Sequence, residues 1–308
     1  MKIKKEHRKI SIENAELIGE GFFSKLYRLD VDTIVKVYRR NTSLDDIERE
    51  LSLVKQAIKH DIPTVISYDV VDVDDKYGVV FELLNLGTLR DEIAAKPEEF
   101  DKQMEEYLKL MTKISTTKID DIEIPDAKQS IIKASTNLKG RLADSVYNKM
   151  ISLIKSIPDT GTLIHGDCHI KNVMYVKNGL YDRNELLIID MDTLSKGNPI
   201  FELAQVTCTY RVFWELYGDN DGDFLGVNSQ TSLKILDRIY EYYFEGCSRE
   251  TYDLNVAKIK TLAYFIMLIW LYKNKSEQVD DFEKVVKMLT DIIRDVENLS
   301  ILSKYVIV

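Results

Sequence analysis

Residues 163–172 of this 308-residue chain read LIHGDCHIKN, and residues 186–192 read LLIIDMD. In the first stretch an apolar run leads into a polar loop that carries Asp167 and, five residues later, Asn172. In the second stretch another apolar run ends at Asp190. Phosphoryl transfer needs a carboxylate that orients and deprotonates the acceptor hydroxyl, and oxygen ligands that hold Mg²⁺ against the phosphates. The order of these three residues therefore predicts phosphoryl-transfer chemistry.

The loop His165–Asn172 and the strand end Ile188–Asp192 together resemble the aminoglycoside phosphotransferase and choline kinase family, whose loop usually reads HGDxHxxN. The resemblance implies a protein-kinase-like fold and an Mg²⁺-dependent transfer of phosphate from ATP or GTP to a small molecule. It also implies roles for individual residues: Asp167 is the catalytic base, Asn172 and Asp190 are metal ligands, and His165 and His169 shape the loop.

Two positions of the loop depart from the family pattern. Cys168 stands where the family often has leucine, and Ile170 stands where it often has proline. Neither change removes a functional group. A thiol beside the base raises the question of a catalytic cysteine, but no separate His–Asn arrangement supports one, so we interpret Cys168 as a packing residue. His169 is interpreted as structural because Mg²⁺ prefers oxygen ligands.

The first 85 residues favour short strands around one helix. The helix is expected to begin after Ser43, a plausible N-cap with Asp46 three residues later, and to end by Pro63. The expected strands are residues 12–17, 25–29, 33–38, 65–73 and 77–84.

A glycine-containing segment lies between the first two of these strands. Gly19 and Gly21, followed by Ser24, would let the backbone approach phosphates closely. Lys36 is the one charge in the apolar run 34–37, so in a kinase-like lobe it would pair with the α- and β-phosphates. The alternative is an exposed lysine on an edge strand.

Lys36 would need a carboxylate partner on the following helix. Glu50 and Glu48 are both candidates, since they lie about 70° and 90° from the centre of the apolar stripe on a helical wheel. Val54 and the Ile62–Pro63 pair fit the family spacing from Glu50. Glu50 is therefore preferred, and Glu48 stays open.

The run 77–84 is expected to lead out of the first lobe. Phe81 would stand at the back of an adenine pocket, and the backbone of Glu82 to Leu84 would offer hydrogen bonds to the base. A buried central strand is the alternative, and both interpretations can hold because backbone atoms would do the recognition.

After Gly87 long helical patterns dominate, for example in residues 100–114 and 129–157, and a strand-like island spans residues 163–190. The sequence thus predicts an α+β, bilobal protein-kinase-like fold. A small antiparallel sheet with one helix forms residues 1–84, and a larger, mostly helical lobe with the catalytic loop and acceptor site forms residues 85–308.

The composition of the chain bears on which classes of partner it binds and on its location. The net charge of −9 argues against nucleic acid or an anionic membrane as a partner. Three scattered cysteines favour a reducing, cytoplasmic location, and the N-terminal segment lacks the apolar core of a signal peptide. The apolar run 262–272 is expected to be a buried helix. No pattern indicates an oligomeric state.

The expected partner is a small hydroxylated acceptor. A cationic compound, such as an aminoglycoside or an amino alcohol, is compatible with the acidic charge, whereas neutral sugars stay open. The acidic residues expected near the acceptor are Asp192, Glu202, Glu215, Asp219, Asp221 and Asp223. The alternative for residues 219–223 is a solvated surface turn.

Two other functions fit the sequence less well. A regulated protein kinase is disfavoured because only four residues separate Asp192 from Gly197, which leaves no room for a long activation segment. A non-catalytic nucleotide-binding module is disfavoured because the lysine, the base and the metal ligands are all present.

Overall fold

The computed structural model describes residues 6–20, 24–39, 42–83, 86–176, 186–221, 225–274 and 279–295. The chain divides into two compact units, Met1–Thr88 with Met174–Asp192, and Leu89–Val173 with Thr193–Val308. The ranges 1–84 and 85–308 predicted from the sequence differ from these units mainly in the segment Met174–Asp192, which belongs to the first unit. That segment joins the first unit because its strand β9 (Val173–Val176) pairs with β7 (Leu86–Thr88).

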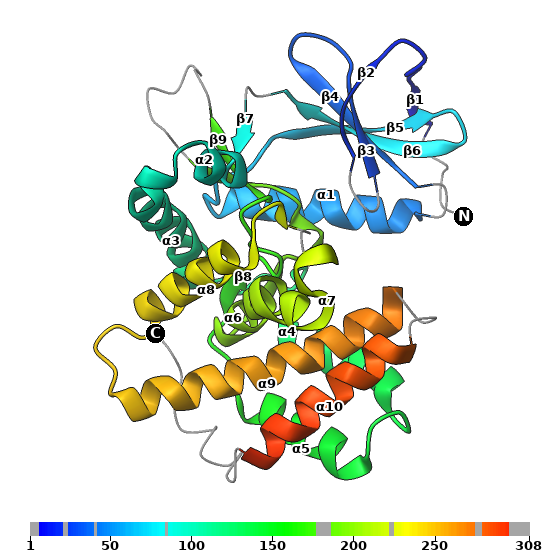
Figure 1. Cartoon of the computed structure of the whole chain (residues 1–308). Coiled ribbons are helices and arrows are strands. Elements are labelled where there is room, and N and C mark those ends of the chain that lie inside the picture. The colour runs from blue at the N-terminus through cyan, green and yellow to red at the C-terminus, as the bar shows by residue number, and fades with distance from the viewer. Residues whose placement is uncertain are drawn as a thin grey trace. The chain divides into compact units, whose positions relative to one another are not determined.

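A six-stranded sheet with the order β1-β5-β6-β4-β3-β2 forms the first unit (Figure 1). Neighbouring strands are antiparallel except β1 and β5, so the sheet is mixed at one edge and not wholly antiparallel as expected. Strand β10 (Leu186–Ile188) joins β9 and β7 in a second, smaller sheet. The strands of the large sheet are β1 (Arg8–Lys9), β2 (Glu16–Glu20), β3 (Ser24–Arg28), β4 (Thr33–Tyr38), β5 (Ser67–Val73) and β6 (Lys76–Glu82).

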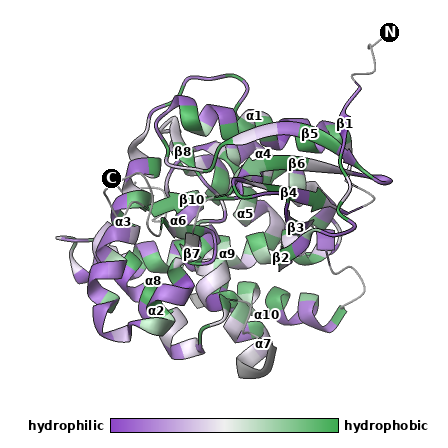
Figure 2. Ribbon diagram, turned by 90° about the horizontal axis from the view of Figure 1, so that it is seen from above, coloured by the Kyte–Doolittle hydropathy of each residue, from purple (hydrophilic) through white to green (hydrophobic). Residues whose placement is uncertain are grey.

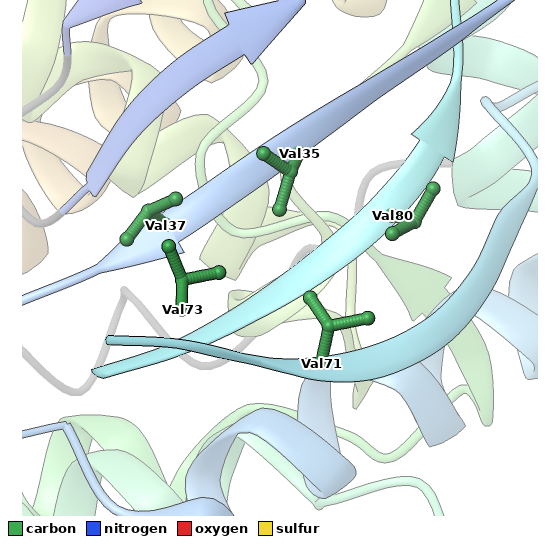
Figure 3. Packing of buried hydrophobic residues seen from close by; sticks show 5 residues of the cluster. All are labelled: Val35, Val37, Val71, Val73 and Val80. Carbon is green, nitrogen blue, oxygen red and sulfur yellow. The ribbon is translucent and has the colours of Figure 1, made fainter. Parts of the chain in front are cut away.

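One face of this sheet is covered by valines from three central strands. Figure 3 shows their side chains gathered together, and all are almost fully buried. Successive side chains of a strand point to opposite faces, so Lys36, which lies between two of these valines in β4, projects from the other face. The valines are Val35, Val37, Val71, Val73 and Val80.

The opposite face packs against α1 (Leu44–Lys59). The helix begins at the expected residue, because Ser43 Oγ accepts a hydrogen bond from the backbone N–H of Asp46 at 3.2 Å. Ile47 and Leu51 of α1 form one buried cluster with Tyr38, Val79 and Phe81 of the sheet. A carboxylate on this side of α1 therefore shares a face with Lys36.

The second unit is mostly helical, with the short antiparallel pair β8 (Thr162–Ile164) and β11 (Ser195–Gly197). A π-helical stretch, Cys208–Val212, joins two of its helices. The helices are α2 (Leu89–Ala95), α3 (Phe100–Thr116), α4 (Ala127–Ser135), α5 (Asp144–Ser156), α6 (Ile200–Thr207), α7 (Phe213–Asp221), α8 (Ser229–Tyr243), α9 (Arg249–Asn274) and α10 (Val279–Asp295).

Helix α9 forms the core of the second unit. By length and composition alone it could cross a membrane, but 67% of its most apolar window is buried inside the structure, as in the core helix of a globular domain. Helix α10 packs against it through Val285, Leu289 and Ile293, which recur at helical spacing. Figure 2 shows hydrophobic and hydrophilic residues alternating along α10 accordingly.

Candidate active site

Lys36 lies at the centre of a charged cluster in the first unit. Its Nζ is 2.8 Å from Glu50 Oε1 and 2.9 Å from Asp190 Oδ1. Burial would lower the pKa of this lysine, but the Asp190 and Glu50 carboxylates outweigh burial and hold the pKa well above its usual value. Lys36 is therefore a fixed cation, and its side chain retains 16% exposure.

The helix places Glu50, and not Glu48, at Lys36. Glu50 is 6% exposed, and its second oxygen accepts a hydrogen bond from Tyr38 Oη at 2.7 Å. Glu48 is exposed. On the helical wheel the angles of the two candidates differed by little. In the structure the two differ clearly, because the side of α1 that carries Glu50 faces the strand with Lys36 and Tyr38.

Asp190 has an unusual backbone conformation. Its φ of 68° falls in the left-handed region, which aspartate tolerates better than most residues. Such strained residues persist where the surroundings hold them, often at functional sites. Here the strand end fixes the carboxylate against Lys36.

The glycine-containing segment is described only at its ends. Gly19 is the second-last residue of β2, and an added Cβ there would lie 3.1 Å from the Leu26 side chain. Ser24 begins β3 opposite Tyr38. Gly21 lies outside the described residues, and its phosphate-binding role stays a prediction.

Two of the backbone N–H groups that were predicted to bind a nucleotide base have partners within the protein. The backbone N–H of Glu82 donates to Ile66 O at 3.0 Å, and that of Leu83 donates to Asp32 O. Neither N–H is available for a nucleotide base in this structure. Leu84 lies outside the described residues. Phe81 is buried in the cluster that faces α1, and its place beside a nucleotide stays a prediction.

The loop His165–Asn172, which is predicted to be catalytic, belongs to the second unit. Asn172 Nδ2 donates to both the backbone oxygen and the Oδ2 of Asp167, each at 3.0 Å. The two hydrogen bonds orient the Asp167 carboxylate, which is 39% exposed. Because they use the amide nitrogen of Asn172, its amide oxygen is the atom that could bind a cation. His169 Nε2 lies 3.5 Å from the same Oδ2.

His165 and Gly166 shape the start of this loop. Buried His165 accepts a hydrogen bond at Nδ1 from the Asp167 N–H at 3.2 Å, and its carbonyl accepts one from Thr193 Oγ1 at 2.7 Å. Gly166 has a φ of 83°, and a Cβ there would lie only 3.0 Å from the Thr193 carbonyl oxygen. The loop therefore needs glycine at this position.

A buried carboxylate that the sequence analysis did not assign to this loop supports it from behind. Glu202 of α6 accepts hydrogen bonds from the backbone N–H of Gly166 at 2.9 Å and of Cys168 at 3.4 Å. Burial raises the pKa of Glu202 to about 7, although these backbone donors and His165 oppose the shift. The available signal was a single charge inside the apolar helix Ile200–Thr207.

Cys168 behaves as a packing residue. Its side chain is buried, and burial raises the pKa of the thiol well above its usual value. A nucleophilic cysteine needs the thiolate form. The structure therefore gives no support to a catalytic thiol at this position.

The expected acidic border of the acceptor site is weaker than the sequence indicated. Glu202 is buried against the loop, and Glu215 is neutralised by Arg211 at 2.9 Å and Lys260 at 3.0 Å. These two residues thus do not present free negative charge. The side chains of Asp219 and Asp221, and the whole of Asp223, lie outside the described residues.

Known proteins share sequence features and the fold of this chain. A family model described as the phosphotransferase enzyme family matches residues 14–225. No curated protein matches the sequence. Among solved structures, a thermostable mutant of aminoglycoside phosphotransferase APH(4)-Ia in its apo form is similar, with a TM-score of 0.61, 13% identity, and coverage of 93% of this chain and 96% of that chain.

Two ligand complexes are similar as well. The GDP and kanamycin complex of APH(2")-IIia has a TM-score of 0.56 and 15% identity, covering 93% of this chain and 95% of that chain. The ternary complex of streptomycin, ATP and APH(2")-IIa has a TM-score of 0.55 and 14% identity, covering 91% of this chain and 93% of that chain.

The fold is that of a kinase-like phosphotransferase, which confirms the predicted α+β class with a sheet-based first lobe and a helical second lobe. Because the family model covers more than half of the sequence, the chain belongs to the phosphotransferase enzyme family.

Proposed function

We propose that this protein transfers the γ-phosphate of ATP or GTP to a hydroxyl group of a small molecule. The observation that carries the proposal is the catalytic loop, in which Asn172 orients an accessible Asp167 carboxylate through two hydrogen bonds. Membership of the phosphotransferase family and the Lys36–Glu50 ion pair support it.

Each residue has a specific task in this proposal. The Asp167 carboxylate accepts the proton of the attacking hydroxyl, and Asn172 keeps that carboxylate oriented. Lys36 binds the nucleotide phosphates, and Glu50 holds the lysine in place. The side-chain oxygens of Asp190 and of Asn172 are each suited to Mg²⁺, since a hard cation prefers oxygen donors. Bound Mg²⁺ supplies positive charge that stabilises the phosphates.

For the acceptor, we infer an amine-bearing compound with a free hydroxyl, such as an aminoglycoside or an amino alcohol. The support is that similar folds have been solved with kanamycin and streptomycin. Similar folds also bind GDP and ATP, which supports a purine nucleotide as the donor.

A protein kinase is the second candidate, and the structure offers it little room. The chain passes from Asp190 to the start of α6 at Ile200 through a short turn and the three-residue strand β11. A phosphorylated activation segment would have to lie in this stretch.

The proposal is tested by incubating the purified protein with Mg²⁺ and ATP or GTP against a panel of aminoglycosides, amino alcohols and sugars. We expect acceptor-dependent release of nucleoside diphosphate and a phosphorylated acceptor detectable by mass spectrometry. D167N is the matched control, because it keeps the side-chain shape. Nucleotide binding without acceptor-dependent turnover across the panel would instead identify a binding module.

The metal assignment has its own test. Asp190→Asn keeps the shape of the side chain and removes the charge that a hard cation prefers. We expect a higher Mg²⁺ concentration for half-maximal turnover, together with weaker nucleotide binding. An unchanged Mg²⁺ titration would remove Asp190 from the metal site. Asn172→Ala should have a milder effect on the titration because Asn172 is already neutral.

A further inference from the structure

The catalytic loop contains a buried backbone donor at Ile170. Ile170 stands where the family pattern often has proline, and proline has no N–H group. Ile170 is fully buried, so its N–H must find a partner within the protein. That partner is Tyr210 Oη, which accepts the hydrogen bond at 2.9 Å.

A second phenol continues the hydrogen-bond chain. Tyr107 Oη donates to the carbonyl of Cys168, and it lies 3.4 Å from Tyr210 Oη. A carbonyl can only accept, so the single proton of Tyr107 is used there, and the contact between the phenols is donated by Tyr210. One chain of hydrogen bonds therefore runs from the Ile170 N–H through both phenols to the Cys168 carbonyl.

The two phenols are held rigidly. Both side chains are fully buried, and burial raises the pKa of each, so both remain protonated donors at neutral pH. Tyr210 lies in the π-helical stretch Cys208–Val212, and its backbone carbonyl accepts a hydrogen bond from buried Ser232 Oγ at 2.8 Å. Single π-helical turns redirect side chains and often occur at functional sites.

The local turn explains why proline would also suit position 170. The backbone N–H of Asn172 donates to His169 O at 2.8 Å, which closes a turn whose second residue is Ile170. That position of a turn favours proline, because its ring fixes φ near −60°. This chain has no such covalent restraint there.

We propose that Tyr210, together with Tyr107, positions the catalytic loop by hydrogen bonding to the backbone of Ile170 and Cys168. The hydrogen bonds that the phenols make to the loop go to the backbone on either side of His169, so the phenols are positioning residues and not catalytic ones. The kinetic part of this inference rests on the proposed function, whereas the structural part does not.

The structural part is tested by amide hydrogen exchange at Ile170. In Tyr210→Phe the Ile170 N–H is left buried without an acceptor, and local opening should become about tenfold more frequent, in line with the usual effect of an unpaired buried donor. Tyr240→Phe is the matched control. It also removes a buried phenol hydroxyl, which contacts Thr207 Oγ1 at 2.6 Å and not the loop. Unchanged exchange at Ile170 in Tyr210→Phe would overturn the proposal.

The kinetic part is tested by a double-mutant cycle with Ile170→Pro, measured as Mg·ATP hydrolysis and as the KM for ATP. With isoleucine at position 170, Tyr210→Phe should lower kcat about tenfold and leave the KM for ATP unchanged. In the I170P background the same change should cost less than about threefold, because no N–H is left unpaired. An equal loss in both backgrounds would overturn the proposal.

Amide exchange and the kinetic cycle test the two parts of the inference separately. Absence of hydrolysis by the wild-type protein would count against the proposed function, and amide exchange would still decide whether Tyr210 holds the loop. A merely structural role would appear as a loss of folding stability shared with Tyr240→Phe, without the rescue by Ile170→Pro.

Discussion

Buried charged side chains of the two units differ in their partners and in the direction of their pKa shifts. In the first unit, the Lys36 ammonium is balanced by the carboxylates of Glu50 and Asp190, each within 3 Å. In the second unit, Glu202 is buried against backbone N–H groups, and Lys258 is buried with no hydrogen-bond partner. Ion pairing raises the pKa of Lys36, whereas burial lowers the pKa of Lys258 to about 8.

The difference has a functional meaning. A charge that is balanced by opposite charges keeps its state over a wide pH range, which suits a group that binds phosphates. A charge that is buried among neutral groups titrates closer to neutrality. The Lys36 cluster should therefore be insensitive to pH near 7, whereas Glu202 and Lys258 should make stability and turnover depend on pH.

The largest expected effect separates the two units by their tasks. Asp167→Asn removes the base in the second unit, so kcat should fall by about 10²–10⁴, the usual contribution of a catalytic base. The nucleotide dissociation constant, measured by calorimetry, should stay nearly unchanged because Lys36, which is proposed to bind the nucleotide phosphates, and its partner Glu50 lie in the first unit. A variant that keeps more than about a tenth of the wild-type rate would exclude Asp167 as the base.

The next effect concerns the ion pair of the first unit. Lys36→Met and Glu50→Gln should each lower turnover about 10- to 100-fold, the equivalent of a charged hydrogen bond, and the double variant should be less than additive. Glu48→Gln is the matched control on the same helix, since its side chain is exposed. Coupling of Lys36 to Glu48 in the cycle would contradict the structure.

Local sequence signals predicted most of the first unit. Ser43 caps α1, and the strand with Lys36 spans residues 33–38, both as expected. The strand expected at 12–17 instead runs from Glu16 to Glu20, because its position depends on pairing with β3 across a bulge between Leu17 and Gly19. Local periodicity contains no information about such a register.

The second unit was harder to predict, and the reason is physical. Residues 129–157 favour helix throughout, yet the chain breaks between α4 and α5 around Gly140, whose φ is 75°. The residues that hold the catalytic loop come from distant helices: Tyr107 from α3, Glu202 from α6 and Tyr210 from the π-helical stretch. Buried polar groups like these depend on tertiary packing, which a motif search along the chain does not detect.

A smaller effect is expected from Lys258. Its folded pKa of about 8 lies below the usual 10.5, so the folded state carries a cost below pH 8 that disappears as the pH rises toward 10.5. Lys258→Met should raise the free energy of unfolding by about 2 kcal/mol at pH 7, and by much less at pH 10.5, in urea unfolding. Lys260→Met, which removes a partner of Glu215, should not stabilise the protein. An equal gain at both pH values would contradict this.

The smallest effect is the most specific to the second unit. Glu202 has a folded pKa of about 7 against a usual 4.5, so lowering the pH from 8 to 6 protonates it. Hydrogen bonds from Gly166 and Cys168 to a neutral acid are roughly half as strong as those to a carboxylate, so the loop should loosen and kcat should fall about threefold.

Folding stability should change in the opposite direction. Because the folded pKa of Glu202 is raised, its contribution to stability is complete below pH 4.5 and is lost as the pH rises through about 7. When the pH is lowered from 8 to 6, the wild-type protein should therefore gain folding stability and lose kcat relative to Glu202→Gln. Parallel pH profiles of kcat in the two proteins would show that Glu202 does not set the pH dependence, and that the second unit holds its catalytic loop by other groups.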